Sequence, residues 1–181
     1  MLWQRLSQTN PPRESALDPH SDPHADPHLR KRPSHAPLWL RMTIPEKQQQ
    51  LLDELALFQD WTERYEYVIS LGKRLPPLAQ SAKTPAHLIK GCQSQVWLDA
   101  ANENGKVRYY ADSDSLITKG MIALFVRILD NESPDDILQA DMSFIQRTGL
   151  KEHLAPTRAN ALSLMTTQMK QRALTFASNP S

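Results

Sequence analysis

The chain has 181 residues, of which 40% are hydrophobic, and this is enough to build one domain around a single core. Its formal net charge of +1 gives no reason to expect nucleic-acid binding, which needs a clustered basic surface. No apolar run approaches the roughly 20 residues that span a bilayer, so no membrane segment is expected. A single cysteine cannot form an internal disulfide, which makes the reducing cytoplasm the simplest setting.

The first 41 residues differ from the rest of the chain in composition. They are rich in Pro, His, Asp and Arg without sustained hydrophobic periodicity, so residues 1–41 are predicted to be a disordered, low-complexity extension. The triplet Asp-Pro-His recurs there and spaces His20, His24 and His28 as on a helix. The prolines forbid that helix, so no preorganised metal site is expected. A start codon assigned upstream of the true one is our hypothesis for the extension.

Residues 42–177 are predicted to form a small α+β domain, followed by a short tail over 178–181. Pro45 suits a first helical turn, and apolar residues follow at helical spacing. Asp60 and Glu63 resemble a capping box that begins a second helix, with Gly72 as the signal for its end.

Two strands are predicted over residues 94–100 and 106–112. The connection NENGK contains Asn104-Gly105, which is a strong hairpin signal. The run HLIK, residues 87–90, is a candidate third strand and would place Cys92 at a turn between strands. We therefore expect helices packed on a small antiparallel sheet of about three strands.

The remainder of the chain is predicted to be helical. Asp112 or Ser113 can cap a helix that is apolar almost all round, and this is expected to be the central buried helix. Its apolar positions are Leu116, Ile117, Met121, Ile122, Leu124, Phe125, Ile128 and Leu129. Ser133 and Pro134 suit the start of the first of two shorter helices. A long last helix should begin near Thr157, with a core face made by Ala161, Leu162, Met165, Met169, Ala173 and Phe176.

Cys92 is the residue whose chemistry needs an explanation. One cysteine cannot supply the four ligands of a structural zinc site or of a common iron–sulfur cluster. It is therefore either an inert core thiol or a nucleophile. Gly91 before it and the polar Gln93, Ser94 and Gln95 after it indicate a loop, and loops carry function more often than packing.

As a nucleophile, Cys92 would act through its thiolate, which a positive charge such as Lys90 would favour. A hydrolase would also need a base, for which His87 and His153 are candidates, but neither papain-type nor caspase-type surroundings are present. Sulfur exchange needs less: the thiolate attacks the outer sulfur of a persulfide, takes it, and later surrenders it. A structural cysteine in an adaptor protein is the third alternative.

Four blocks of the sequence resemble, in order and spacing, the SufE family of cysteine desulfuration proteins. They are DELALFQDWTERYEYVISLGKRLP, LIKGCQSQVWL, DSDSLITKGMIALFVRIL and EHLAPTRANAL. The resemblance implies a SufE- and IscU-like fold with the acceptor cysteine, Cys92, at a loop that can turn inward. It also implies that Cys92 accepts persulfide sulfur from the desulfurase SufS, stimulates that enzyme, and passes the sulfur to the SufBCD scaffold for iron–sulfur cluster assembly. The pyridoxal phosphate would belong to the desulfurase, so no cofactor of the chain's own is expected.

Three further residues match the family pattern. Asp112 and Asp114 match an Asp-Ser-Asp segment near the acceptor loop, with helix capping as the alternative. Arg158 matches an arginine at the start of the last helix, where it would contact the desulfurase or the loop, unless it is a plain surface residue. Ala111 and Ala161 stand where family members often have glycine, which alters the local backbone freedom beside Asp112 and Arg158.

A paralogue of this family, CsdE, accepts sulfur from the desulfurase CsdA and shares much of the pattern. The tripeptide after Cys92 favours SufE. The expected partners are thus a SufS-type desulfurase and SufBCD, in the cytoplasm, without nucleic acid or membrane. The oligomeric state, a homodimer included, is left open.

Overall fold

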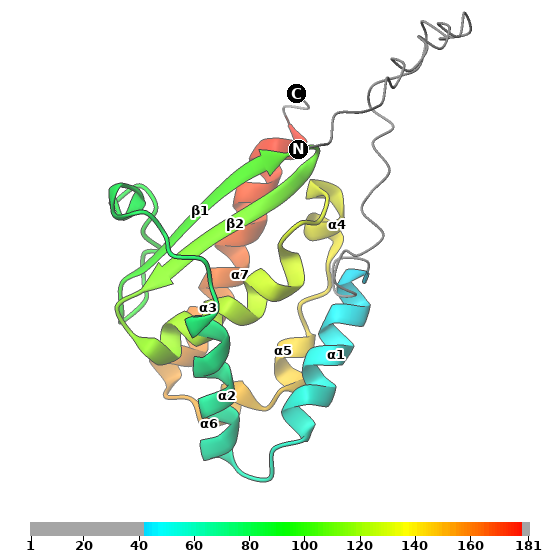
Figure 1. The fold of residues 1–181 in the computed structure, drawn as a ribbon, viewed down its shortest axis with the longest axis vertical. Helices are drawn as coiled ribbons and strands as arrows, with labels where there is room; N and C mark the ends of the chain where they lie inside the picture. The colour runs from blue at the N-terminus through cyan, green and yellow to red at the C-terminus, as the bar shows by residue number, and fades with distance from the viewer. Residues whose placement is uncertain (1–41, 179–181) are drawn as a thin grey trace, which may run out of the picture. The chain divides into compact units, whose positions relative to one another are not determined.

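The computed structural model describes residues 42–178 (Figure 1). The predicted extension over residues 1–41, the three histidines of its Asp-Pro-His triplets and the last residues of the predicted tail lie outside this range. The elements are α1 Ile44–Ala56, α2 Trp61–Lys73, a 3₁₀-helix Gln80–Ala82, β1 Val96–Glu103, β2 Lys106–Ser113, α3 Leu116–Leu129, α4 Pro134–Gln139, α5 Phe144–Arg147, α6 Leu150–His153 and α7 Pro156–Ala177. The predicted mixture of helices with a small antiparallel sheet is confirmed. None of the described helices is both long enough and apolar enough to cross a membrane.

The sheet is a hairpin of two antiparallel strands, paired in register from Val96 opposite Ser113 to Glu103 opposite Lys106. The predicted turn is confirmed: Asn104 and Gly105 both have positive φ, 54° and 76°, as a two-residue hairpin turn requires.

The third strand predicted over residues 87–90 is reduced to a single bridge. Leu88 pairs with Trp97, supported by hydrogen bonds on either side of this pair. The chain then turns away at Gly91, whose φ of 90° is incompatible with an extended strand. The turn therefore ends the pairing where the loop containing Cys92 begins.

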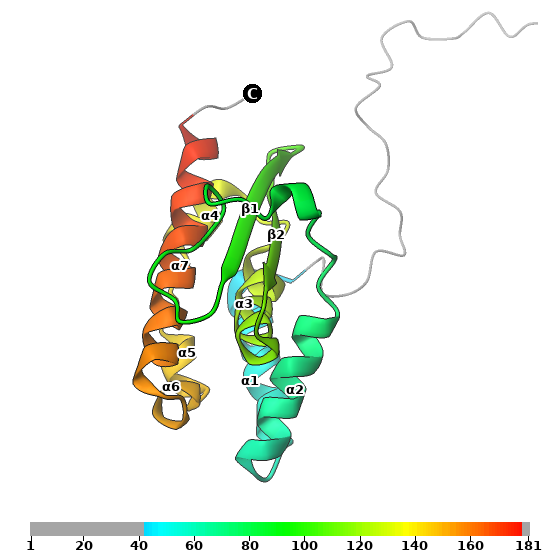
Figure 2. The same cartoon turned by 90° about the vertical axis from the view of Figure 1, so that its left-hand side faces the viewer.

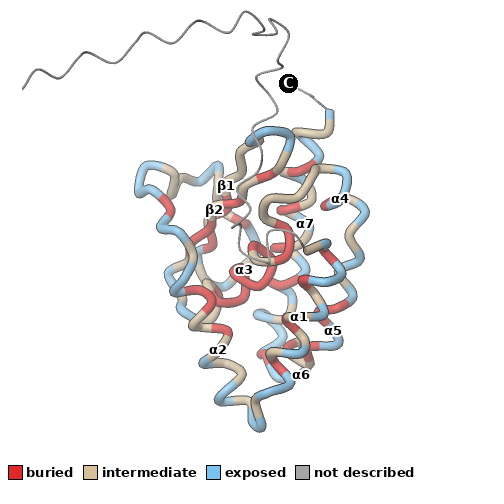
Figure 3. Tube along the Cα trace, turned by 45° about the vertical axis from the view of Figure 1, so that its right-hand side comes forward, coloured by how far each residue is buried: buried red, intermediate tan, exposed pale blue. Residues whose placement is uncertain are grey.

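Helix α3 occupies the centre of the fold. It contacts α1, α2, α7 and β2, and most of its residues from Gly120 onward are buried (Figure 3). Figure 2 shows α7 along one side of α3 and the hairpin, with α2 on the other side and α1 behind α3 in this view. The prediction of a central buried helix is confirmed. Met165 and Met169 of α7 are fully buried and belong to this core, as predicted, whereas Phe176 is half-buried.

Two glycines allow α2 and α3 to approach each other closely. A Cβ atom on Gly120 would lie 2.4 Å from the carbonyl oxygen of Val68, and one on Gly72 would lie 2.7 Å from the backbone nitrogen of Gly120. Gly72 lies one residue before the end of α2 at Lys73, so it does mark the end of the helix. It does not form a left-handed cap, because the cap residue is Arg74 and its backbone is right-handed. Close helix contact is the physical reason for glycine at this position.

Of the helix caps predicted from the sequence, those of α2 and α4 are confirmed and that of α3 is wrong. Asp60 accepts a hydrogen bond from the backbone N–H of Glu63 at 2.9 Å, and Ser133 likewise caps α4. Helix α3 is capped by Ser115, so the prediction of Asp112 or Ser113 is wrong. The reason is that β2 stays paired with β1 through Ser113, which leaves the chain extended at both predicted positions.

A polar cluster joins α1, α2 and α3. Arg127 forms an ion pair with Glu54, with distances of 2.5 and 2.6 Å to its two carboxylate oxygens, and the Tyr67 hydroxyl also contacts both residues. Burial raises the pKa of Tyr67 to about 12, and the adjacent Glu54 carboxylate adds to the shift. The cluster ties three helices together at the side of the core.

Candidate functional site

Cys92 lies in the segment between the Leu88 bridge and β1, here called the Cys92 loop (residues 91–95). Its thiol is free, half-buried and packed against the hydrophobic core. Burial raises the pKa of the Cys92 thiol, without an opposing contribution from the charge of Lys90 that the sequence suggested. The thiol is therefore protonated at neutral pH in this conformation and is a poor nucleophile until its surroundings change.

Gly91 forms the turn immediately before Cys92. Its φ of 90° lies in the region that residues with a side chain rarely adopt. Leu164 of α7 covers it closely, since a Cβ atom on residue 91 would come to 3.1 Å from Leu164 Cδ1. The loop turn and the contact with α7 both depend on glycine.

The first polar residues of the Cys92 loop are held weakly. The Thr157 hydroxyl at the start of α7 donates to Gln93 Oε1 at 3.2 Å, and the Thr118 hydroxyl of α3 donates to the Ser94 hydroxyl at 3.4 Å. Both bonds are long for hydroxyl donors. Gln93 is exposed on the loop surface. This part of the loop therefore has few contacts that oppose its movement.

Gln95 is held more firmly than the residues before it. Its backbone N–H donates to Asp114 Oδ1 at 3.0 Å, while its carbonyl oxygen accepts from the Ser113 hydroxyl at 2.7 Å and from the Asp114 backbone N–H at 3.3 Å. Asp114 thus contacts the Cys92 loop directly, and a contact between Asp114 and a partner stays a prediction. The loop is fixed at the β1 end and loosely held nearer the thiol.

Asp112 has a different environment from Asp114. It is buried, and its two carboxylate oxygens accept from Lys83 at 2.7 Å and Lys119 at 2.8 Å. Burial alone would raise the pKa of Asp112, but the hydrogen bonds from the two lysines outweigh it and lower the pKa below the usual aspartate value. The Lys83 ammonium also lies 5.4 Å from the centre of the Trp97 ring. The pair of lysines ties the segment before the Cys92 loop to β2 and α3.

The sequence alone did not identify Lys83, Lys119 or Leu164 as neighbours of this site. Lys83 lies in a proline-rich connection 29 positions before Asp112, and Leu164 lies toward the far end of the chain. No pattern in the sequence pairs residues at such separations. Lys119 lies seven positions after Asp112, but only the turn from β2 into α3 brings the two together.

Arg158 is exposed in the first turn of α7, next to Thr157, which contacts the Cys92 loop. Its role toward the loop or a desulfurase stays a prediction. The two alanines that replace family glycines, Ala111 and Ala161, are both buried in the core.

The two histidines considered as bases are engaged elsewhere. His87 Nδ1 donates to the carbonyl oxygen of Ala82 at 2.7 Å, and its Nε2 lies 3.5 Å from Asp99 Oδ1. His153 stacks on Trp61 with 3.7 Å between ring centres. Neither set of contacts includes Cys92, so the described part of the chain shows no cysteine–histidine pair of the kind that a hydrolase uses.

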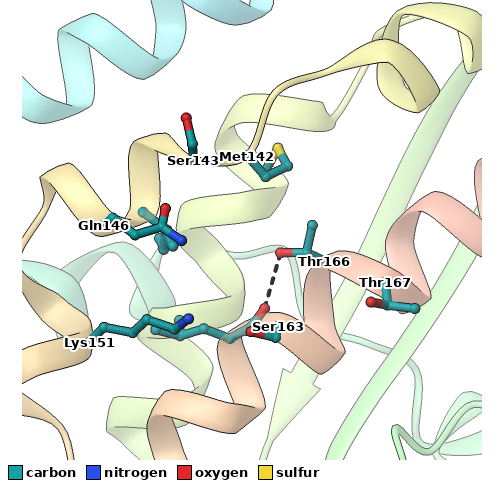
Figure 4. Close-up of a pocket in the computed structure, with 9 residues that line it drawn as sticks. Met142, Ser143, Gln146, Lys151, Ser163, Thr166 and Thr167 are labelled. Carbon is teal, nitrogen blue, oxygen red and sulfur yellow. Dashed lines mark hydrogen bonds between the residues drawn. The ribbon is translucent and has the colours of Figure 1, made fainter.

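Two surface hollows lie away from the thiol. One of about 380 Å³ is lined by residues of α5, α6 and α7, among them Lys151 and Thr166 (Figure 4). The other, of about 400 Å³, lies between the start of α1 and α4. Neither is lined by the Cys92 loop. Within residues 42–178, no three His, Cys, Asp or Glu side chains are grouped so that they could hold a metal ion.

A family model described as "SufE: Fe-S metabolism associated domain" matches residues 49–173. The chain belongs to the SufE family. An uncharacterised SufE-like protein of Synechocystis sp. is 34% identical over 134 residues, which cover 74% of this chain and 84% of that protein. The solution structure of a hypothetical protein from Thermus thermophilus has the same fold, with a TM-score of 0.64 and 22% identity, covering 76% of this chain and all of that one.

Membership of the SufE family confirms the resemblance inferred from the sequence blocks. It gives the chain a sulfur-transfer role in iron–sulfur metabolism, related to cysteine desulfurases. The matched range includes the whole Cys92 loop and the residues that bond to it. The SufE domain therefore contains the chain's only thiol in a defined environment.

Proposed function

We propose that this SufE-family protein accepts sulfur from a SufS-type cysteine desulfurase as a persulfide on Cys92, stimulates that desulfurase, and relays the sulfur to SufBCD in the cytoplasm. The observation that carries the proposal is the position of Cys92: a half-buried, unpaired thiol in a loop that is firmly held only at Gln95. On this proposal pyridoxal phosphate acts on the desulfurase, and this chain supplies the thiol alone.

The proposed chemistry is a thiol–persulfide exchange. The Cys92 thiolate attacks the outer sulfur of the desulfurase persulfide, and the new S–S bond to Cys92 forms as the donor's S–S bond breaks. The donor cysteine leaves as a thiolate and takes up the proton that Cys92 lost. One thiol and one persulfide are consumed and one of each is formed, so the step needs neither an oxidant nor a reductant.

The raised pKa of Cys92 supports a mechanism in which the thiol is unreactive until a partner binds near the loop. Burial keeps the thiol protonated, and exposure of the loop would restore an ordinary thiol pKa and a larger thiolate fraction. Opening the loop costs the long hydrogen bonds of Gln93 and Ser94 and the packing of Cys92, while Gln95 keeps its bonds. The same burial would protect a newly formed persulfide from solvent thiols and oxidants.

The decisive experiment is an intact-mass measurement after incubation with a SufS-type desulfurase and cysteine. The expected result is a gain of one sulfur atom that the isosteric Cys92→Ser variant does not show, together with faster alanine release that the same variant abolishes. Because Cys92 is the only cysteine, no second thiol in the chain confuses the assignment. Repeating the assay with a CsdA-type desulfurase identifies the preferred donor.

The alternatives give different results in the same assay. A cysteine hydrolase would turn over a substrate or become labelled at Cys92 without any desulfurase. An adaptor with a structural cysteine would still accelerate alanine release as the Cys92→Ala variant. Either result, without sulfur gain by the wild type, contradicts the proposal.

A further inference from the structure

Three large hydrophobic side chains within residues 42–178 are exposed: Leu57 at 75%, Leu116 at 62% and Leu174 at 52%. Leu116 is the first residue of α3 and lies before the buried part of this helix, which begins at Thr118. Leu57 follows the end of α1, and Leu174 lies near the end of α7. Of the three, only Leu116 is flanked on both sides by residues that bond to the Cys92 loop.

The residues on either side of Leu116 bond to the Cys92 loop, closely through Asp114 and only weakly through Thr118. Two residues before it, Asp114 accepts from the backbone N–H of Gln95 at 3.0 Å. Two residues after it, the Thr118 hydroxyl donates to the Ser94 hydroxyl at 3.4 Å. Leu116 therefore begins α3 between two residues that bond to the Cys92 loop.

The exposure of Leu116 has no explanation within the described part of the chain. A hydrophobic staple joins the residue before the cap to the fourth residue of the helix, so Leu116, the first residue of α3, has no place in one. Here the residue before the Ser115 cap is Asp114, which is polar and bound to the loop. The buried positions of α3 begin at Thr118, so Leu116 lies outside the core.

We propose that Leu116 is an apolar contact for the cysteine desulfurase that delivers sulfur to Cys92. The inference rests on the proposed function, because direct exchange requires the donor sulfur to reach bonding distance of Cys92. A stable protein interface covers about 800 Å² on each partner, so a donor centred on Cys92 also covers the adjoining start of α3. On this proposal, the desulfurase presents an apolar surface to Leu116.

The test compares Leu116→Ser with Leu57→Ser and Leu174→Ser, which remove exposed leucines from other elements of the fold. The dissociation constant of each variant with a SufS-type desulfurase is measured by titration calorimetry, and its melting temperature by circular dichroism. Leu116→Ser is expected to weaken binding about five- to tenfold, with unchanged melting. The two control variants are expected to bind within about twofold of the wild type.

Equal affinities for all three variants would overturn the proposal. A second result would also overturn it: the wild type self-associates in sedimentation, and Leu116→Ser loses this self-association but binds the desulfurase normally. A second copy of the chain would then be the partner that covers the leucine. If the wild type gains no sulfur at Cys92, the proposed function itself fails and the contact fails with it. Sulfur gain by the wild type with unchanged binding by Leu116→Ser refutes the contact alone.

Discussion

Leu164 of α7 lies directly against Gly91, so that a Cβ atom on residue 91 would come to 3.1 Å from Leu164 Cδ1. The backbone at Gly91 also has a φ of 90°, which L-residues with a side chain rarely adopt. Two separate effects thus require glycine at this position. Both act at the turn immediately before Cys92, whose side chain packs against the core.

Replacing Gly91 by alanine is expected to displace the Cys92 loop outward. The left-handed backbone alone costs about 1–2 kcal/mol for a residue with a Cβ, and the contact with Leu164 adds to it. We expect a lower free energy of unfolding and faster alkylation of Cys92 by iodoacetamide. Gly105→Ala is the matched control, because Gly105 has a φ of 76° but no atom within 4 Å of its Cβ position. An alkylation rate in Gly91→Ala equal to that of the control would contradict this account.

The reactivity of Cys92 should depend on pH with a midpoint above that of an exposed cysteine, because burial raises its pKa. Alkylation rates measured across roughly pH 7 to 10, the range around an ordinary thiol pKa of about 8.5, test this directly. The folded state binds the thiol proton more tightly than the unfolded state. The contribution of Cys92 to the free energy of unfolding is therefore complete below the thiol pKa of the unfolded chain. It is lost as pH rises through the higher thiol pKa of the folded protein.

The corresponding stability measurement uses Cys92→Ser as the reference. The free energy of unfolding of the wild type should fall more steeply at alkaline pH than that of the variant. The comparison is needed because Tyr67 and Tyr109 also have raised pKa values and contribute in the same direction in both proteins. Parallel curves for the two proteins would show that the thiol is not held in the buried state in solution.

Substituting Asp112 by asparagine leaves Lys83 and Lys119 facing each other without their carboxylate. We expect a loss of about 1 kcal/mol in the free energy of unfolding at neutral pH. The pKa of Asp112 is lowered, so its contribution is complete above the pKa of an unfolded aspartate and is lost as pH falls through the folded value. The difference from the wild type, followed by urea unfolding at several pH values, should therefore shrink in acid. Lys83→Met, which keeps the Lys119 pair, is expected to lose less.

Gly120→Ala is expected to be severely destabilising. Its Cβ would lie 2.4 Å from the carbonyl oxygen of Val68, which belongs to the backbone of α2 and cannot move aside alone. Overpacking at a helix–helix contact costs about 1–3 kcal/mol when the structure relaxes, and we expect the upper end or beyond. Urea unfolding measures the loss, with Gly105→Ala again as the control. A loss no larger than that of the control would mean that α2 and α3 are less closely packed than described.

Much of the fold was predictable because its signals are local. The positive φ values of Asn104-Gly105, the Asp60 cap and the Ser133-Pro134 start depend on residues within a few positions of each other. The same holds for the thiol, because the adjacent residues of the GCQSQVW block are enough to identify Cys92 and its loop. The third strand failed because the run 87–90 satisfies the strand pattern, but Gly91 ends its pairing after one bridge.

The sequence by itself determined the hairpin, the buried central helix, the family and the residue that carries the proposed chemistry, since these depend on short-range patterns and motif spacing. Only the tertiary structure decided that Asp112 binds two lysines, that Gly72 serves helix contact, and that Leu116 faces solvent. It also decided that Leu164 covers Gly91 and that burial suppresses the Cys92 thiolate. The physical reason is that burial and electrostatic environment arise from contacts between segments far apart in the chain, which no local pattern encodes.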